Sequence, residues 1–311
     1  MTTKHLIPTG YLIIVLLLFT SCIKTLSDQL PEPPPKLVVN AAISSDSILT
    51  VNISKSIPIL NNENNMTLPF VQGATINFYE DGQFLFPLQE TDHGYYSKPA
   101  YKPSEGRVYS IKVDKQGFAS VSAQTTIPEK VGIISFDTTI VTEEYQDYSE
   151  KIISCELKYT DDNNIENFYS LECIKSYYDP DDNYFVEHQY IFVEESEEYF
   201  YDKPYGILLW TDKLTNGQTV SIKFEIDPYY IYYQPEGNDD VSVKYTIYLK
   251  SLEEDYYQYE KSKHLYYENG DGDDPFTEPV LIYSNVENGL GVFGGFSSDT
   301  TSFNYFIDYQ Y

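Results

Sequence analysis

Hydrophobic and polar residues alternate along most of this chain, and a period of two is typical of β-strands with one buried face. The alternation is clear from Val108 to Val113 and again from Phe303 to Tyr311. Clusters of glycine, proline, asparagine and serine interrupt it, as turns between strands do. The pattern predicts a mainly β fold, with a β-sandwich domain over residues 36–128 and a larger β-rich C-terminal domain over residues 131–311.

Several turns can be placed within this pattern. Residues 36–43 and 48–53 are predicted to form a hairpin, and Asp81-Gly82 predicts a tight turn between two strands. Asn216-Gly217 is a strong hairpin signal between the apolar segments 207–210 and 219–226. We therefore expect each of these segment pairs to be antiparallel neighbours.

One segment departs from the period of two. Ser251-Leu252-Glu253-Glu254 matches the capping box that begins many helices, and Asn269-Gly270 is a stop signal. The side chains compatible with one helical face are Leu252, Tyr256, Tyr259 and Tyr266. We expect one amphipathic helix here, packed on a sheet by its tyrosines.

The string GLGVFGG, Gly289–Gly295, fits the glycine pattern of dinucleotide-binding loops. That pattern requires a helix directly after the glycines, because the helix N-terminus binds the phosphates. Here a turn-rich segment and a final strand with period two follow instead. We interpret the glycines as β-bulges or places of close backbone approach.

The first residues predict the cellular compartment. Leu12–Phe19 is apolar but too short to span a bilayer, and Thr20-Ser21-Cys22 follows it. A weakly basic start, a short apolar stretch and small residues are typical of a secretory signal peptide. Because the segment ends on Cys22, it predicts a lipoprotein that is cleaved after residue 21 and acylated at Cys22 with chains such as palmitate. Residues 22–35 contain Pro31, Pro33, Pro34 and Pro35, and we expect a lipidated, proline-rich stalk.

Charge excludes several classes of partner. The full chain carries a net charge of −28, and the mature chain, without Lys4, carries −29. Such a protein repels nucleic acids and other polyanions. The 32 tyrosines and 17 phenylalanines supply enough apolar area for a folded core.

Several segments together resemble the Bacteroidota lipoprotein family called domain of unknown function 4249. The segments that carry the resemblance are 73–78, 161–169, 210–217, 274–280 and 283–294. The resemblance covers essentially the whole mature chain, and its N-terminal part is also similar to carboxypeptidase-regulatory and immunoglobulin-like sandwiches. It implies an outer-membrane protein that accompanies a TonB-dependent transporter, on the cell-surface side rather than the periplasmic side. It implies no catalytic residues.

Two cysteines remain after lipidation. Cys155 and Cys173 flank a predicted turn almost symmetrically, so in a simple hairpin they would face each other. A disulfide suits an extracytoplasmic protein, and two buried free thiols are the alternative. The histidines of the mature chain, His93, His188 and His264, lack zinc-ligand spacing.

Two acidic loops are weak calcium candidates. They contain Asp179, Asp181 and Asp182, and Asp271, Asp273 and Asp274. Neither has the glycine and final glutamate of an EF-hand in register, so solvated turns are the default interpretation and we predict no metal and no cofactor.

Tyrosines gather in two places. They are Tyr229, Tyr230, Tyr232 and Tyr233 in one segment, and Tyr199 and Tyr201 in another. Core packing is one interpretation, and a recognition surface for a ligand or partner is the other. With the resemblance, the leading hypothesis is a non-catalytic accessory that captures a ligand for a TonB-dependent transporter or docks onto it. The alternatives are a structural or adhesive surface module and, less favoured, an extracellular hydrolase.

Overall fold

The structure, a computed structural model, describes residues 33–57, 69–144, 149–162, 166–179, 183–193, 200–202, 206–228, 241–269 and 280–307. Lys36–Ser56 and Thr67–Tyr311 form one compact unit, and it is this unit that we describe. The unit is built mainly of strands, as the alternating pattern predicted.

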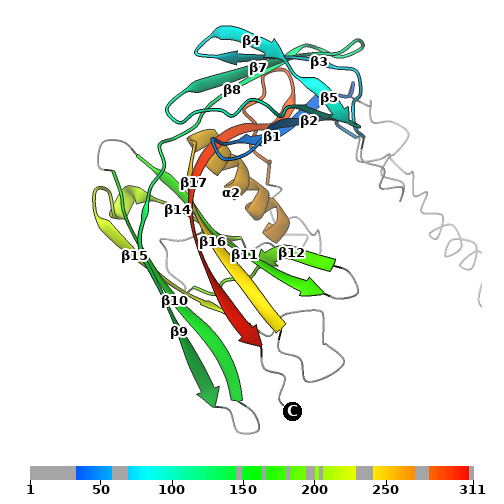
Figure 1. Cartoon of the computed structure of the whole chain (residues 1–311). Coiled ribbons are helices and arrows are strands. Elements are labelled where there is room, and N and C mark those ends of the chain that lie inside the picture. Colours follow the sequence, from blue (N-terminus) through cyan, green and yellow to red (C-terminus); the bar gives the residue numbers. More distant parts are fainter. Residues whose placement is uncertain are drawn as a thin grey trace, which may run out of the picture. The chain divides into compact units, whose positions relative to one another are not determined.

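The N-terminal part is a two-sheet sandwich (Figure 1). One sheet contains β1 (Leu37–Ile43), β2 (Leu49–Lys55), β6 (Tyr95–Lys98) and β5 (Gln89–Asp92), and the other contains β4 (Gln83–Pro87), β3 (Thr75–Glu80), β7 (Val108–Asp114) and β8 (Val121–Thr126). Alternate residues of these strands, such as Val39, Val51 and Ile111, are buried in a common core. The predicted hairpin of β1 and β2 is confirmed.

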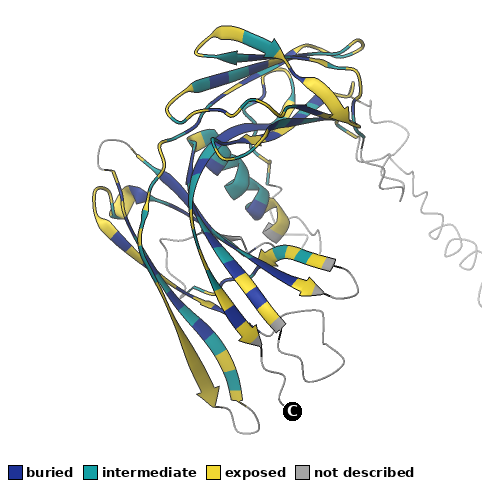
Figure 2. Cartoon of the chain, in the orientation of Figure 1, coloured by how far each residue is buried: buried dark blue, intermediate teal, exposed yellow. Residues whose placement is uncertain are grey.

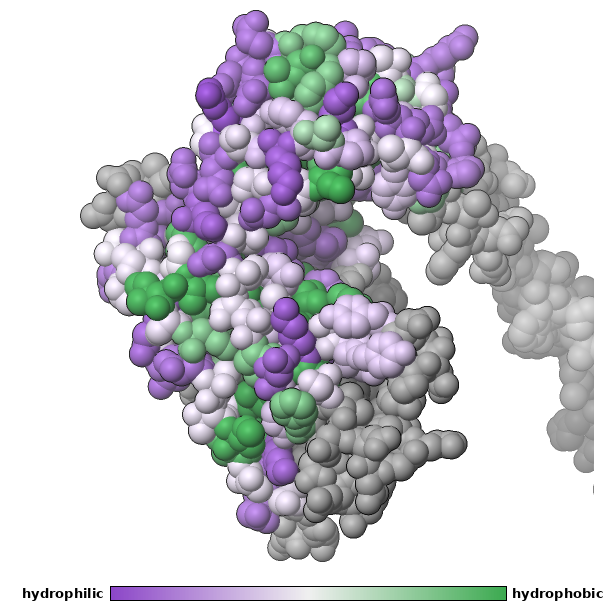
Figure 3. Space-filling view, in the orientation of Figure 1, coloured by the Kyte–Doolittle hydropathy of each residue, from purple (hydrophilic) through white to green (hydrophobic). Residues whose placement is uncertain are grey.

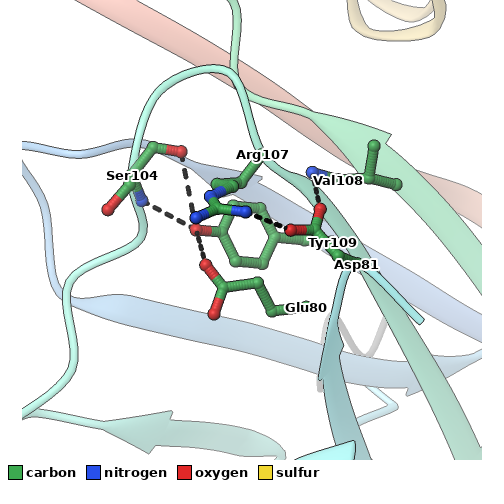
Figure 4. A network of polar contacts seen from close by, with 6 residues as sticks. All are labelled: Glu80, Asp81, Ser104, Arg107, Val108 and Tyr109. Carbon is green, nitrogen blue, oxygen red and sulfur yellow. Dashed lines mark hydrogen bonds and ion pairs between the residues drawn. The ribbon is translucent and has the colours of Figure 1, made fainter. Parts of the chain in front are cut away.

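The predicted turn at Asp81-Gly82 joins β3 to β4. Both residues have positive φ, 48° and 76°, which is the conformation of a two-residue type I′ hairpin. Arg107, the one arginine of the chain, donates to Asp81 Oδ2 at 2.5 Å, and the Val108 N–H donates to Asp81 Oδ1 at 3.2 Å (Figure 4). Arg107 therefore braces a turn in this sandwich.

Two further sheets face each other in the C-terminal part. The first has the order β13 (Phe200–Asp202), β14 (Ile207–Thr211), β11 (Phe168–Asp179), β16 (Val241–Leu252), β17 (Leu290–Ile307), with β12 (Asn183–Gln189) also paired to β11. The second has the order β15 (Thr219–Ile226), β10 (Ser149–Thr160), β9 (Ile133–Glu144). Their inner faces share one core, to which Trp210, Phe224 and Tyr245 belong. β9 is exposed over most of its length (Figure 2).

Strand β17 belongs to both parts of the molecule. Its first residues, Leu290–Gly295, pair in parallel with β1, and Phe296–Ile307 pair in antiparallel with β16. The N-terminal sheet that contains β1 and the C-terminal sheet that contains β16 are thereby joined into one sheet of ten strands. The alternation near the C-terminus predicted a final strand but not this double pairing.

The glycines of β17 lie where backbones and side chains approach closely. A Cβ atom on Gly291, whose φ is +96°, would lie 2.0 Å from the carbonyl oxygen of Val39. A Cβ on Gly295 would lie 2.1 Å from the carbonyl oxygen of Thr126, and one on Gly294 would lie 2.5 Å from the Tyr256 ring. The close-approach interpretation is confirmed, and β17 continues where a dinucleotide site needs a helix.

The hairpin predicted around Asn216-Gly217 is wrong. β14 pairs with β11 and β13, whereas β15 pairs with β10 in the facing sheet. A short 3₁₀ helix, Asp212–Leu214, lengthens the connection beyond a two-residue turn. The turn itself forms, with positive φ at Gly217, but it carries the chain from one sheet to the other.

The predicted helix is present as α2, Glu254–Asn269, but it begins later than the capping box indicated. Ser251 and Leu252 are the last residues of β16, and Glu253 provides the cap by accepting the Tyr256 N–H at 3.3 Å. The buried face also differs, since Tyr257 and His264 are buried and Tyr266 is exposed. The strand β16 therefore continues into the segment that the local helix signals assigned to the start of the helix.

No helix in the described ranges is long and apolar enough to cross a membrane. This finding concerns the part of the chain from residue 33 onward, because the predicted signal peptide lies outside the described residues.

Replacing Gly295 by alanine is expected to lower the free energy of unfolding by roughly 2–3 kcal/mol. The added methyl group would meet a backbone oxygen at 2.1 Å, and that oxygen cannot move without disturbing β8. Gly132→Ala is the matched control, because its Cβ would find no atom closer than Asp299 Oδ2 at 3.9 Å. Denaturant unfolding checks both variants, and equal losses would contradict the close-approach interpretation.

Candidate functional site

One sheet face in the C-terminal part is covered by α2 rather than by a second sheet. Because side chains alternate along a strand, Tyr169 and Leu171 of β11 point into the core, and Phe168 and Ser170 point toward α2. Phe168 and Tyr257 pack with ring centroids 5.0 Å apart and hold the helix to this face. Leu209 and Leu252 pack in the same cluster, and part of the face under the helix is left unfilled.

A cavity of about 400 Å³ remains between the sheet and α2. Its lining residues on the sheet are Ser170, Glu172, His188, Ile207, Leu209, Lys250 and Leu252, and those on the helix are Tyr256, Glu260 and Lys263. This volume lies within the range of small-molecule sites, which combine apolar walls with a few placed polar groups. The cavity is therefore the candidate site.

An ion pair lies on the sheet side of the cavity. Lys250 Nζ is 2.6 Å from Glu172 Oε1, and the two side chains are only 15% and 12% exposed. Lys250 Nζ also lies 5.1 Å from the centroid of the Phe296 ring. Burying two charges is costly unless they are paired. Because Glu172 is on β11 and Lys250 is on β16, the pairing of these two strands holds the ion pair in place.

A second ion pair lies on the helix side. Lys263 Nζ is 2.5 Å from Glu260 Oε2, one helical turn apart. Burial raises the pKa of the Tyr256 hydroxyl well above its ordinary value, and the carboxylates of Glu260 and Glu172 raise it further. The cavity thus has opposite charges on both of its walls.

Ser170 gives the site an unused hydrogen-bonding group. Its side chain lines the cavity, is 1% exposed, and its hydroxyl has no hydrogen-bond partner among the described residues. Ser170 lies directly opposite Lys250 in the strand register, so the hydroxyl and the ammonium group come from adjacent positions. A buried polar group without a protein partner is costly, and such a group is completed by water or by a ligand.

The charged side chains that line the cavity are paired with one another. Each of its carboxylates is paired with a lysine, so neither stands as an unpaired base beside the Ser170 hydroxyl. His188, the histidine of the lining, is exposed on β12. Paired charges that are held in place can instead match the charges of a bound molecule.

Two segments that carried the sequence resemblance form a buried polar network away from the cavity. Asp161 accepts hydrogen bonds from the Tyr169 hydroxyl, from the Gly217 N–H at 2.7 Å and from Asn167 Nδ2 at 3.3 Å. Asn167 also donates to Asp212 Oδ2 at 3.3 Å, and burial raises the pKa of Asp212. The network fixes the connection between the two C-terminal sheets, so these residues have a structural role.

A third such segment, 283–294, fastens β17 to the start of α2. Asn285 Oδ1 accepts the Phe293 N–H at 3.0 Å, and its Nδ2 donates to the Phe293 carbonyl at 2.9 Å and to Asp255 Oδ2 at 3.4 Å. The Tyr283 hydroxyl donates to Asp255 as well. The segment that carries the most specific part of the sequence resemblance therefore positions the helix that covers the cavity.

Most of the sequence-predicted site residues lie outside the described residues. They are the lipid-attachment residue Cys22, the tyrosines Tyr199, Tyr229, Tyr230, Tyr232 and Tyr233, and the calcium candidates Asp181, Asp182, Asp271, Asp273 and Asp274. Of the others, Tyr201 is in β13 opposite Leu208, and Asp179 ends β11. Among the described residues, no group of three or more histidines, cysteines or carboxylates has the geometry of a metal site.

Cys155 and Cys173 do not form the predicted cross-strand pair. β10 places Cys155 between Phe224 and Thr138, and β11 lies in the facing sheet. The hairpin prediction is wrong because β10 and β11 belong to different sheets and do not pair with each other. Both cysteines are buried free thiols. Burial raises the pKa of the Cys155 thiol to about 12 and raises that of Cys173 as well.

Sequence reasoning missed the cavity residues, since Glu172, Lys250 and Ser170 are ordinary polar positions of alternating strands. The one available signal is that β11 and β16 both alternate polar with apolar residues although both are central strands. On the face seen in Figure 3, hydrophobic residues form small separate groups among hydrophilic ones. That view therefore offers no large apolar surface as a rival site.

Comparison with known proteins identifies one family. The model of the family described as "Domain of unknown function (DUF4249)" matches residues 23–302. No curated protein matches the chain.

Glu253 is expected to make stability depend on pH. Burial, and then the charge of Asp255, raises its pKa from 4.5 to about 6, although the N–H groups of Asp255 and Tyr256 oppose the shift. The native state holds this proton more tightly than the unfolded state does. The contribution of Glu253 to stability is therefore fully present below pH 4.5 and is lost as the pH rises through 6. The loss is expected to be roughly 1 kcal/mol, since partial exposure screens the effect.

Glu253→Gln should remove this loss while its carbonyl oxygen still caps the helix. Unfolding free energies at pH 4.5 and 7 measure the difference. The exposed neighbour Glu254, changed to Gln, is the control with the same change in net charge. The explanation is wrong if the two variants have the same pH dependence.

Proposed function

The chain belongs to the DUF4249 family, and on that premise we propose that it is a non-catalytic lipoprotein of the outer membrane that captures a ligand for a TonB-dependent transporter. The proposal joins a location, an activity and a partner. The location and the capture are supported by the chain itself, and the transporter partner is what the family resemblance implies.

The location is supported by the beginning of the chain. A short apolar stretch and small residues lead to Cys22, and the family match begins at the next residue. Acyl chains on Cys22 would hold the protein at the membrane, and the proline-rich residues that follow would separate the folded part from the lipid. The resemblance favours the cell-surface side.

Capture is supported by the cavity under α2. The single observation that carries it is the Ser170 hydroxyl, which lines the cavity without a partner beside the buried pair of Lys250 and Glu172. A fold rarely leaves such a group unsatisfied unless water or a ligand completes it. The pairing of each carboxylate with a lysine favours binding over hydrolysis.

A second candidate function, a structural or adhesive surface module, is favoured by β9. From Asp137 to Glu144 this strand is exposed on both faces, and among the described strands it pairs with β10 alone. An unpaired strand edge can add a strand from another protein.

Gentle solubilisation of the outer membrane and purification through a C-terminal tag test the proposal. We expect a TonB-dependent barrel to be recovered in stoichiometric amount. Cys22→Ser, which cannot be acylated in the same way, is expected to release the protein from the membrane and to abolish recovery of the barrel. Recovery of the acylated protein alone, under conditions that preserve other such complexes, would contradict the transporter role and favour the surface module.

A further inference from the structure

The charges of the cavity are balanced. Glu172 and Glu260 face Lys250 and Lys263, and the two pairs have nitrogen–oxygen distances of 2.6 Å and 2.5 Å. A ligand with one net charge would bind the oppositely charged member of an ion pair. The other member of that pair would then be buried without a compensating charge. The cavity therefore disfavours simple anions and simple cations.

A ligand with both charges close together avoids this penalty. In an α-amino acid the carboxylate and the ammonium group are on the same carbon, so their separation resembles that of the ion pair on the sheet. The carboxylate can accept from Lys250 Nζ and from the Ser170 hydroxyl, which lie opposite each other in the register of β11 and β16. The ammonium group can donate to Glu172, whose carboxylate has more lone pairs than Lys250 uses.

The remaining walls indicate an apolar side chain. Ile207, Leu209 and Leu252 are the aliphatic residues of the lining. Sugars are commonly bound by stacking on aromatic rings, but the Tyr256 ring lies against Gly294 and is not open on that face. The aliphatic wall would instead bury the side chain of an amino acid.

We propose that the cavity under α2 binds a small α-amino-acid zwitterion with an apolar side chain. Ser170 and Lys250 bind its carboxylate, Glu172 binds its ammonium group, and the aliphatic wall receives its side chain. This inference rests on the proposed capture function and names the class of ligand that the site would take.

Isothermal titration calorimetry of the full-length chain in detergent micelles tests the ligand class. The probes are L-leucine, N-acetyl-L-leucine, which lacks the positive charge, L-leucinamide, which lacks the negative charge, and maltose. We expect L-leucine to bind, and each singly charged analogue to bind at least about ten-fold more weakly because it leaves one buried charge unmatched. Equal or tighter binding of an analogue or of maltose would overturn the proposal, as would a failure of L-leucine to bind.

Variants of the site give a sharper result. Ser170→Ala should weaken L-leucine binding by about ten-fold, the usual effect of losing one hydrogen bond to a charged group. Glu172→Gln should weaken L-leucine binding and strengthen N-acetyl-L-leucine binding, because the freed Lys250 then favours an anion. Lys250→Met should shift the preference toward L-leucinamide.

The matched control is Glu156→Gln. Glu156 is paired with Lys158 at 3.1 Å on β10, in the facing sheet, and it does not line the cavity. The ligand preference of the Glu156→Gln variant should equal that of the unchanged protein. An unchanged preference in Glu172→Gln, with a normal thermal transition, would contradict the assignment. Ser170→Ala provides the same test if Glu172→Gln fails to fold.

The two proposals can fail separately. Recovery of a transporter barrel without L-leucine binding would overturn the ligand class and leave the accessory role standing. Binding of L-leucine that depends on Ser170, without recovery of a barrel, would overturn the accessory role and support the ligand class.

Discussion

The pairing of β17 with two different strands is the constraint on which the rest of the structure depends. The strand can run beside β1 and then beside β16 only if it passes through a crowded region, where the Val39 and Thr126 carbonyl oxygens leave no space for a Cβ atom. Glycine is the one residue without that atom. The GLGVFGG segment, which superficially resembles a phosphate-binding loop, is the solution to this packing problem.

The same segment positions the candidate site. The Tyr256 ring lies against Gly294, so α2 can approach β17 closely, and Asn285 binds both the Phe293 backbone and Asp255 at the start of the helix. The helix in turn covers a sheet face that has Ser170, Glu172 and Lys250 on it. A short glycine-rich strand segment thus determines where the helix sits and how much space remains beneath it.

Local physical chemistry predicted those features of the fold that depend on neighbouring residues. The alternation predicted strands, Asp81-Gly82 predicted a type I′ turn, and the missing helix after Gly295 excluded a dinucleotide site. Features that depend on distant partners were not predictable in this way. Asn216-Gly217 forms a turn whether its strands pair with each other or with different sheets, and Cys155 and Cys173 lie on successive strands that belong to different sheets. The cavity was missed for the same reason, because Ser170 and Lys250 meet only through the register of β11 and β16.

Native-state hydrogen exchange tests most directly whether β17 makes the two parts of the molecule one cooperative unit. If it does, the most protected amides of β1, of β16 and of both halves of β17 should exchange through one global opening, with the same free energy and the same dependence on denaturant. A lower opening free energy for β1 and residues 290–295, with β16 and residues 296–307 still protected, would contradict that claim. The sandwich would then unfold independently, and the glycine segment would not hold the site in place.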